Sequence, residues 1–191
     1  MLSATAVRVT DAALQVLGTG GLHALSHARV DATAGLPPGS TSNYFRTRAA
    51  LVASAVARLR ELDGAAWQAT LAAGPPHHPA QLADMYARFV DDATGAARTR
   101  TIARYVIFVQ GVVQPELLES LNADRRLLVE WTAEALRSFD VPEATTAAET
   151  LLAAVEGLIM HRLTGFVTSP AAPEVHRMVD ILCRRGHAPR L

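Results

Sequence analysis

Apolar residues recur every three or four positions along almost the whole chain, which is the spacing typical of amphipathic α-helices. Glycine and proline interrupt the pattern at intervals, and no segment carries the alternation typical of a strand. The pattern therefore predicts an all-α protein of about nine helices. The predicted helices cover residues 3–18, 27–34, 40–45, 47–73, 79–92, 98–113, 115–139, 140–167 and 173–185.

Capping residues set the boundaries of several predicted helices. Glycines at positions 18, 20 and 21 are expected to end the first helix, because glycine is a poor helix former. Ser26 and Thr47 each precede a helical segment, and each hydroxyl can accept a hydrogen bond from an amide of the first turn. Residues 140–143 (Asp-Val-Pro-Glu) have the pattern of a capping box that opens the eighth helix.

The segment 26–51 is predicted to contain two short helices separated by a tight turn, followed by a long helix. Residues 35–38 (Gly-Leu-Pro-Pro) favour a left-handed helix end and cannot continue the first helix. The second helix has only about two turns, so larger helices must brace it. Leu36 and Phe45 are the apolar residues expected to point inward for that purpose. The outward positions carry small or polar side chains suited to hydrogen bonding, which are Ser40, Ser42, Asn43 and Tyr44.

The formal charge is zero overall, but it is distributed unevenly along the chain. Residues 1–60 carry six Arg against Asp11 and Asp31, a net charge of +4, and residues 61–191 carry a net charge of −4. The first part of the chain is therefore compatible with a polyanionic partner. Lys is absent and Arg takes its place, which suits bidentate contact with phosphate or guanine. A compositional bias of the genome explains that choice equally well.

The run that begins at Leu25 resembles the helix-turn-helix of the TetR family of bacterial transcriptional repressors. The matching residues are an apolar and hydroxyl pair, a turn glycine, a small apolar residue, a Gly-Ser pair, an aromatic pair, a basic residue and a closing leucine. They are Leu25, Ser26, Gly35, Leu36, Gly39, Ser40, Tyr44, Phe45, Arg48 and Leu51. The specific part of the resemblance covers residues 5–55. It implies a DNA-binding domain over residues 1–50 and a helical effector-binding and dimerisation domain over residues 51–191.

The resemblance implies that the outward residues of the motif contact a double-stranded DNA operator. Asn43 is the expected reader of a base edge, because its amide can donate and accept hydrogen bonds at once. The predicted DNA-binding residues are Ser26, His27, Arg29, Pro38, Gly39, Ser40, Ser42, Asn43, Tyr44 and Arg48. Pro38 and Ser42 stand where Lys and Tyr are common in the family. A helical ligand-binding or adaptor protein that has lost specific DNA binding is therefore the alternative.

Large apolar side chains, with a few polar ones among them, are spread over the helices of the second half. The resemblance implies that they line a pocket for a small apolar or aromatic effector whose binding releases the repressor from DNA. The predicted lining residues are Phe89, Tyr105, Phe108, Val109, Trp131, Met160 and His161. The alternative for each of them is a place in an ordinary helical core.

The helix predicted over residues 140–167 is apolar on nearly all sides. Its apolar surface is larger than a single partner helix can cover. The family resemblance favours a homodimer in which this helix and the last helix pair with their copies. A dimer would also place two reading helices one DNA turn apart. The predicted interface residues are Leu152, Val155, Ile159, Leu163, Phe166, Val175 and Met178. Burial inside the monomer is the alternative.

Several other classes of protein are not supported by the sequence. Cys183 is the only cysteine, which excludes an internal disulfide and fits a reducing compartment. No apolar stretch suits a signal peptide or a membrane span, so we expect a soluble, cytoplasmic protein with no membrane partner. The chain lacks a glycine-rich phosphate loop, a CxxC pair and a nucleophile elbow. We therefore expect no enzyme activity, no cofactor and no metal site.

Overall fold

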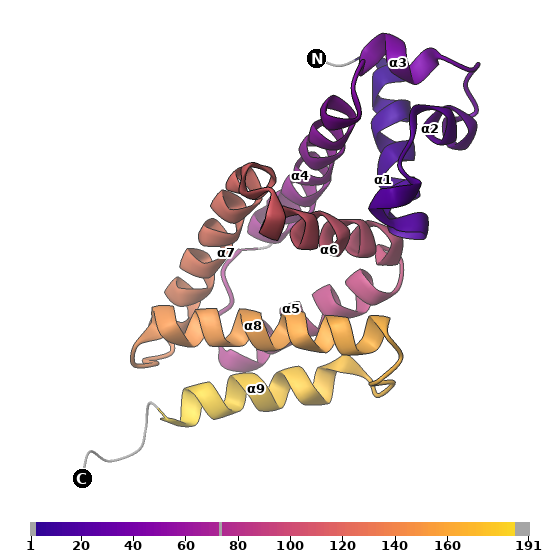
Figure 1. Cartoon of the computed structure of the whole chain (residues 1–191). Helices are drawn as coiled ribbons and strands as arrows, with labels where there is room; N and C mark the ends of the chain where they lie inside the picture. The colour runs from indigo at the N-terminus through magenta and orange to yellow at the C-terminus, as the bar shows by residue number, and fades with distance from the viewer. Residues whose placement is uncertain (1–2, 73, 186–191) are drawn as a thin grey trace. The chain divides into compact units, whose positions relative to one another are not determined.

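The computed structural model describes residues 3–72 and 74–185 (Figure 1). Within these residues every regular element is a helix, so the predicted all-α class is confirmed. The helices of the described ranges are α1 (Ala4–Ala24), α2 (His27–Ala34), α3 (Ser40–Tyr44), α4 (Arg48–Ala72), α5 (Pro79–Thr94), α6 (Arg98–Val113), the 3-10 helix η1 (Pro115–Leu117), α7 (Glu119–Ser138), α8 (Ala144–Leu163) and α9 (Ala171–Arg185). None of them is long and apolar enough to cross a membrane.

The helices group into two compact units. Unit 1 falls within Met1–Ala72 and Ala97–Leu121 and contains α1 to α4, α6 and η1. Unit 2 falls within Ala73–Ala96 and Asn122–Leu191 and contains α5, most of α7, α8 and α9. This grouping follows packing, and the functional boundary expected at residue 50 stays a prediction.

Unit 1 is built on α1, which packs against α2, α4 and α6. Its apolar stripe follows the predicted helical spacing, because residues three or four apart share one face. The most buried members of this core are Val9, Ala13 and Leu17 of α1, Val30 of α2, Leu51, Ala55 and Leu59 of α4, and Ala103 and Ile107 of α6. Leu36 and Phe45 pack against the same core from the turn and from the end of α3, as predicted. The short helices are therefore braced by larger ones.

Unit 2 is built on α5, which packs against both α8 and α9. Figure 1 shows α8 and α9 running side by side. The buried side chains of these three helices are mainly aliphatic and include Leu82, Val90, Leu151, Val155, Ile159, Val175 and Val179. A buried hydrogen bond between the Tyr86 hydroxyl and Thr132 Oγ1, 2.6 Å long, adds a polar link from α5 to α7.

The predicted bounds of the first and of the seventh helix differ from the structure. The first helix does not end at Gly18, because helical backbone continues to Gly20 and the break falls at Gly21, with φ 72° and ψ −178°. The prediction was wrong because close packing of Gly18 against α6 outweighs its poor helix propensity. The helix predicted over 115–139 is divided into η1 and α7.

The capping box predicted at residues 140–143 is absent. Asp140 and Glu143 both have positive φ, 57° and 48°, and the Glu143 side chain makes no capping hydrogen bond. A capping box needs an extended backbone at its first residue, and the tight turn after α7 does not provide one.

The end of α8 is a Schellman motif rather than a continuation to residue 167. Gly165 has φ 75°, its N–H donates to the Arg162 carbonyl at 3.1 Å, and the Phe166 N–H donates to the His161 carbonyl at 2.9 Å. The rings of His161 and Phe166 make the apolar contact of the motif, with centroids 5.0 Å apart. Glycine at the left-handed position therefore ends α8 at Leu163.

Candidate nucleic-acid interface

The segment α2–turn–α3 has the helix-turn-helix arrangement expected from the sequence. Ser26 caps α2, since its Oγ accepts a hydrogen bond from the Arg29 N–H at 3.3 Å. Gly35 ends α2 in the left-handed conformation with φ 61°. Gly39 precedes α3 with φ 87°, a conformation that side chains with a Cβ rarely adopt. Two glycines thus set the direction of the chain between the two helices.

Asp31 of α2 holds the turn and the start of α3, a role that the sequence analysis missed. Its side chain is buried, with 3% of its surface exposed. Oδ2 accepts the Gly39 N–H at 2.8 Å, and Oδ1 accepts the N–H and the hydroxyl of Thr41 at 2.7 and 2.6 Å. Its backbone carbonyl accepts the Leu36 N–H at 2.9 Å. One residue therefore satisfies four donors of the turn and of α3.

The environment of Asp31 keeps its carboxylate ionised. Burial acts to raise the pKa of this group, but hydrogen bonds from the Thr41 hydroxyl and from the Thr41 and Gly39 amides outweigh it, aided by the nearby His27. The net result is a pKa below the ordinary value for Asp. A negative charge at the amino end of α3 also favours the helix dipole.

His27 holds the other end of α3. Its Nε2 lies 2.6 Å from the Phe45 carbonyl oxygen, and a carbonyl only accepts, so Nε2 carries the hydrogen. His27 was predicted to contact DNA, and the structure gives its ring this internal bond. Thr47 then caps α4, as predicted, by accepting the Ala50 N–H at 3.1 Å.

Two arginines also bind helix ends within unit 1. Arg8 of α1 donates to the Ala34 carbonyl at the end of α2, at 2.8 Å. Arg48 donates to the carbonyls of Leu22 and Leu25 at the end of α1, at 2.6 and 3.3 Å. Cations at helix carboxyl ends are favourable because free carbonyls gather there. Arg48, which was expected to bind the DNA backbone, therefore has a structural task as well.

The outward face of α3 presents Asn43 and Tyr44. Both side chains are exposed, Tyr44 by 44%. Neither makes a hydrogen bond to any of the residues that the structure describes. Their amide and hydroxyl groups are therefore available to an external partner.

The serines of α3 are less available than the sequence suggested. Ser40 Oγ donates to the Pro37 carbonyl at 2.6 Å, and Ser42 Oγ donates to the Gly39 carbonyl at 2.8 Å. A hydroxyl has a single hydrogen, so in this arrangement neither serine can donate to a phosphate oxygen. Both can still accept a hydrogen bond from a base amino group. The two hydroxyls are therefore limited to accepting hydrogen bonds while these internal bonds are kept.

The two acidic residues of the first sixty are both engaged internally. Asp11 forms an ion pair with Arg58, with Nε 2.7 Å from Oδ1, and Asp31 is buried under α3. Arg29 and Arg46 are exposed. The surface around α3 is therefore positive in character, although the whole chain is neutral.

The residues predicted to line an effector site are divided between the two units. Tyr105, Phe108 and Val109 belong to unit 1, and the rings of Tyr105 and Phe108 meet edge to face with centroids 6.4 Å apart. The members in unit 2 are Phe89, Trp131, Met160 and His161. Phe89, Val109 and Met160 are exposed, and the others range from half-buried to exposed. Neither unit alone assembles the set.

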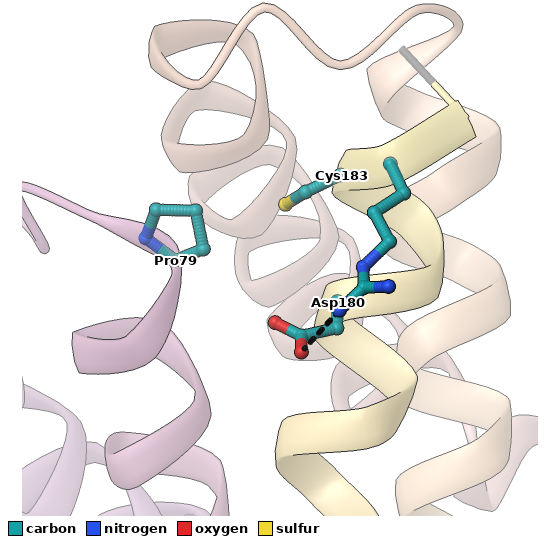
Figure 2. Close-up of a pocket in the computed structure, with 4 residues that line it drawn as sticks. Pro79, Asp180 and Cys183 are labelled. Atoms are coloured by element: carbon teal, nitrogen blue, oxygen red, sulfur yellow. Dashed lines mark ion pairs between the residues drawn. The ribbon is translucent and has the colours of Figure 1, made fainter. Parts of the chain in front are cut away.

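Unit 2 contains an open hollow of about 260 Å³ between the start of α5 and the end of α9 (Figure 2). It is lined by Pro79, Asp180, Cys183 and Arg184, and Asp180 pairs with Arg184 at 3.7 Å. Burial, together with the nearby Asp180, raises the pKa of the Cys183 thiol, which makes it a weak nucleophile at neutral pH. None of the predicted effector residues lines this hollow.

The residues predicted for a dimer interface differ in their availability. Val155, Ile159 and Val175 are buried in the chain itself, Ile159 to 2% exposure. Leu152, Leu163 and Met178 are half-buried. Phe166 is 78% exposed. The first three serve the packing of the chain, so only the other four of this set have apolar surface left for a second copy.

Comparison with known proteins agrees with this fold. The family model described as "Tetracyclin repressor-like, C-terminal domain" matches residues 77–185. The transcriptional regulator BetI of Serratia proteamaculans is 27% identical over 188 residues, which are 95% of this chain and 93% of that protein. A TetR-like regulator from Rhodococcus sp. RHA1 has a similar structure, with a TM-score of 0.73, 23% identity and full coverage of both chains. The multidrug-binding protein EbrR, solved with ethidium, has a TM-score of 0.63 and 26% identity, with 95% of this chain and 99% of that chain covered.

The helix-turn-helix followed by a helical carboxyl-terminal part defines a helical transcriptional regulator. Because the family model matches more than half of the chain, the chain belongs to the TetR family. Members of this family are transcriptional regulators, which is the class that the sequence predicted.

Proposed function

We propose that the chain is a homodimeric repressor that binds an operator in double-stranded DNA through α3 and is released by a small apolar or aromatic effector. The observation that carries the DNA-binding part is the pair of exposed, unbonded side chains on α3, Asn43 and Tyr44. They stand on a short helix that is held at both ends by α2. A rigid helix with polar side chains free on its outer face is what base readout in the major groove requires.

The residues divide into two roles at the DNA. Asn43 reads a base edge, and the serines of α3 add base contacts through their lone pairs. Tyr44, Ser26 and Arg29 contact phosphates and set the register of the protein without specifying sequence. Ser26 suits this role because its oxygen accepts the capping bond, which leaves its hydroxyl hydrogen to donate. We add Arg46 to this group, because it is exposed and makes no ion pair or hydrogen bond with the described residues.

The effector part of the proposal rests on the family and on one relative. EbrR was solved in complex with ethidium, a planar aromatic cation, and it is 26% identical to this chain. The seven aromatic, apolar and imidazole side chains predicted above offer comparable chemistry. In a Trp67→Phe variant, which keeps Trp131 as the single tryptophan, ethidium should quench or shift the fluorescence in the absence of DNA. A non-intercalating aromatic ligand that does the same should also weaken DNA binding, since coupling between two sites is reciprocal.

The dimer part of the proposal uses exposed and half-buried apolar residues of α8, of the turn after α8 and of α9. These are Leu152, Met160, Leu163, Phe166, Met178 and Ile181. A two-fold contact would bury them and place two copies of α3 on successive turns of one DNA face.

The decisive experiment for the proposed function is selection of bound duplexes from a random pool with the wild-type protein. We expect enrichment of an inverted repeat, with affinity for it that falls steeply as salt rises. Failure to enrich any sequence, together with weak salt dependence on duplex DNA, would favour the alternative of a ligand-binding or adaptor protein. Pro38 and Ser42 are the residues that keep this alternative open.

A further inference from the structure

Asp31 and His27 lie one turn apart on α2, and each binds one end of α3. Asp31 accepts the N–H groups of Gly39 and Thr41 at the amino end, at 2.8 and 2.7 Å. His27 lies 2.6 Å from the Phe45 carbonyl at the carboxyl end. Residues four apart share one face of a helix, so α2 offers an acceptor and a donor at the separation of the two ends of α3.

Local residues cannot provide this anchoring for α3. Gly39 is the N-cap residue and has no side chain with which to accept an amide of the first turn. A helix of five residues, Ser40–Tyr44, is also too short to persist without outside support. The amides at the start of α3 therefore depend on an acceptor from elsewhere in the fold, and that acceptor is the Asp31 carboxylate.

The Asp31–Thr41 contact also defines the rotation of α3 about its axis. Thr41 is fully buried, and Asp31 Oδ1 accepts both its N–H and its hydroxyl, the latter at 2.6 Å. A helix turns by about 100° per residue, so Asn43, two positions after Thr41, points to the outside when Thr41 is held inward. Loss of the anchor would allow α3 to roll or fray, and Asn43 would lose its fixed direction.

We propose that Asp31 is a positioning residue that sets operator specificity without touching DNA, with His27 as its counterpart at the other end of α3. The proposal rests on the proposed DNA-binding function. Its particular claim is that specificity depends on a carboxylate buried behind the reading helix. The negative charge of Asp31 is shielded from DNA by α3 and by the donors around the carboxylate, so this charge does not weaken phosphate binding.

The test compares Asp31→Asn with Asp11→Asn. Both substitutions remove one negative charge from the same unit, but Asp11 lies on the surface in an ion pair with Arg58. The probes are the duplex enriched by the wild-type protein and a scrambled duplex of equal length. We expect Asp31→Asn to reduce the ratio of the two affinities by about tenfold or more, because an amide cannot accept all three hydrogen bonds. Asp11→Asn should leave the ratio unchanged and raise both affinities slightly.

Variants at Thr41 keep the test decisive if Asp31→Asn folds poorly. Thr41→Val removes the buried hydroxyl with little change of shape. It should reduce the ratio of the affinities for the enriched and the scrambled duplex by a smaller factor than Asp31→Asn does. Thr41→Ser keeps the hydroxyl and should keep the ratio. Slowed exchange of the Thr41 amide hydrogen in the wild type should be lost in Asp31→Asn. At the carboxyl end, His27→Ala should reduce the ratio, and His27→Gln, whose amide can reach the same carbonyl, should restore part of it.

The outcomes separate this inference from the proposed function. If the wild type enriches a duplex but folded Asp31→Asn and Thr41→Val keep the full ratio, Asp31 is only structural and the inference is wrong. If both variants lose stability and retain the ratio below their unfolding temperatures, the same conclusion holds. If the wild type enriches no duplex, the proposed function fails first, and the inference falls with it.

Discussion

Gly18 of α1 lies against the backbone carbonyl of Thr99 in α6, so closely that a Cβ at position 18 would stand 2.1 Å from that oxygen. Real Cβ atoms essentially never approach another heavy atom of a different residue more closely than 3.0 Å. The approach of α1 to α6 inside unit 1 therefore requires glycine. The helix at the centre of unit 1 is in this way packed directly on α6.

Gly18→Ala should destabilise unit 1 by about 1–3 kcal/mol or more, because the backbone of α6 must move to admit the methyl group. Gly64→Ala is the matched control, since Gly64 lies in α4 and a Cβ added there would meet nothing within 4 Å. That substitution should stabilise the protein by about 0.5–1 kcal/mol through better helix propensity. Urea unfolding of the two variants should therefore shift in opposite directions. Equal shifts would show that α1 and α6 are not packed this closely.

Arg48 and Arg46 should separate fold stability from phosphate binding. Arg48→Ala removes two hydrogen bonds to the end of α1 and should lower the free energy of unfolding by about 1–2 kcal/mol. Arg46→Ala should leave stability unchanged and reduce the salt dependence of binding by about one phosphate per subunit. Thermal unfolding and DNA titrations at several salt concentrations give both quantities. A salt slope that changes only in Arg48→Ala would return the phosphate role to Arg48.

Tyr86 should make unit 2 sensitive to high pH. Thr132 Oγ1 donates to the Leu128 carbonyl at 2.7 Å, so the Tyr86 hydroxyl must be the donor in its 2.6 Å bond to Thr132. Burial raises the pKa of Tyr86 to about 12. The neutral hydroxyl is favoured in the folded state, so its contribution is complete below pH 10 and is lost as the pH rises towards 12.

The free energy of unfolding should therefore fall by about 2 kcal/mol between pH 10 and 12 through this residue alone. Tyr86→Phe should be less stable than the wild type at pH 8 by about 1 kcal/mol, and the gap should close or reverse at pH 12. Urea unfolding of both proteins across this range measures the difference. A constant gap would mean that Tyr86 ionises without a penalty in the folded protein.

The helices were predictable because their signal is local. Apolar spacing identified each helix, and Ser26, Gly35 and Thr47 were correctly read as caps, since a cap involves residues only a few positions apart. The boundary predicted at Gly18 failed because distant packing decided it. Gly18 was read as a helix end, although its contact with α6 is some eighty residues away along the chain.

The exposed polar residues of α3 were predictable and their supports were not. Asn43 and Tyr44 stand out because they are polar residues on the outer face of a helix with a known pattern. Asp31 gave no comparable signal, since its partners Gly39 and Thr41 lie across a turn. The available hint was that Gly39 cannot cap α3, so another acceptor had to exist. The DNA contacts predicted for His27 and Arg48 stay predictions, but their internal carbonyl partners were missed, because charge and position do not reveal such partners.

Assembly should depend on the exposed apolar residues of α8, of the turn after α8 and of α9. Phe166→Arg combined with Ile181→Arg should weaken a dimer by about tenfold or more, because two apolar contacts would be replaced by charges. Leu127→Arg is the control, since Leu127 is an exposed apolar residue of α7. Sedimentation across a range of concentrations measures the association.

Ile159→Arg, by contrast, should unfold unit 2, because Ile159 is buried in the chain itself. A wild type that is monomeric at micromolar concentration would contradict the dimer.

Asn43 provides the most direct test of how α3 faces DNA. Its amide is exposed, unbonded to the described residues and one position before Tyr44, and it can pair with both groups of an adenine edge. Asn43→Ala should cost about 1–3 kcal/mol on the selected operator and leave binding to a scrambled duplex unchanged. Stability should not change, because the side chain makes no bond inside the described fold.

Tyr44→Phe is the companion variant, since it removes a single hydroxyl from the neighbouring position of the same helix. Its expected partner is a phosphate, which is present at every sequence, so operator and scrambled duplex should lose affinity alike and by a small factor. The two variants therefore have different signatures on the same pair of duplexes. If Asn43→Ala lowers both affinities equally, Asn43 contacts the DNA backbone. The face of α3 turned to the bases would then be the one that carries Ser40, whose oxygen still accepts hydrogen bonds while its hydrogen is donated to Pro37.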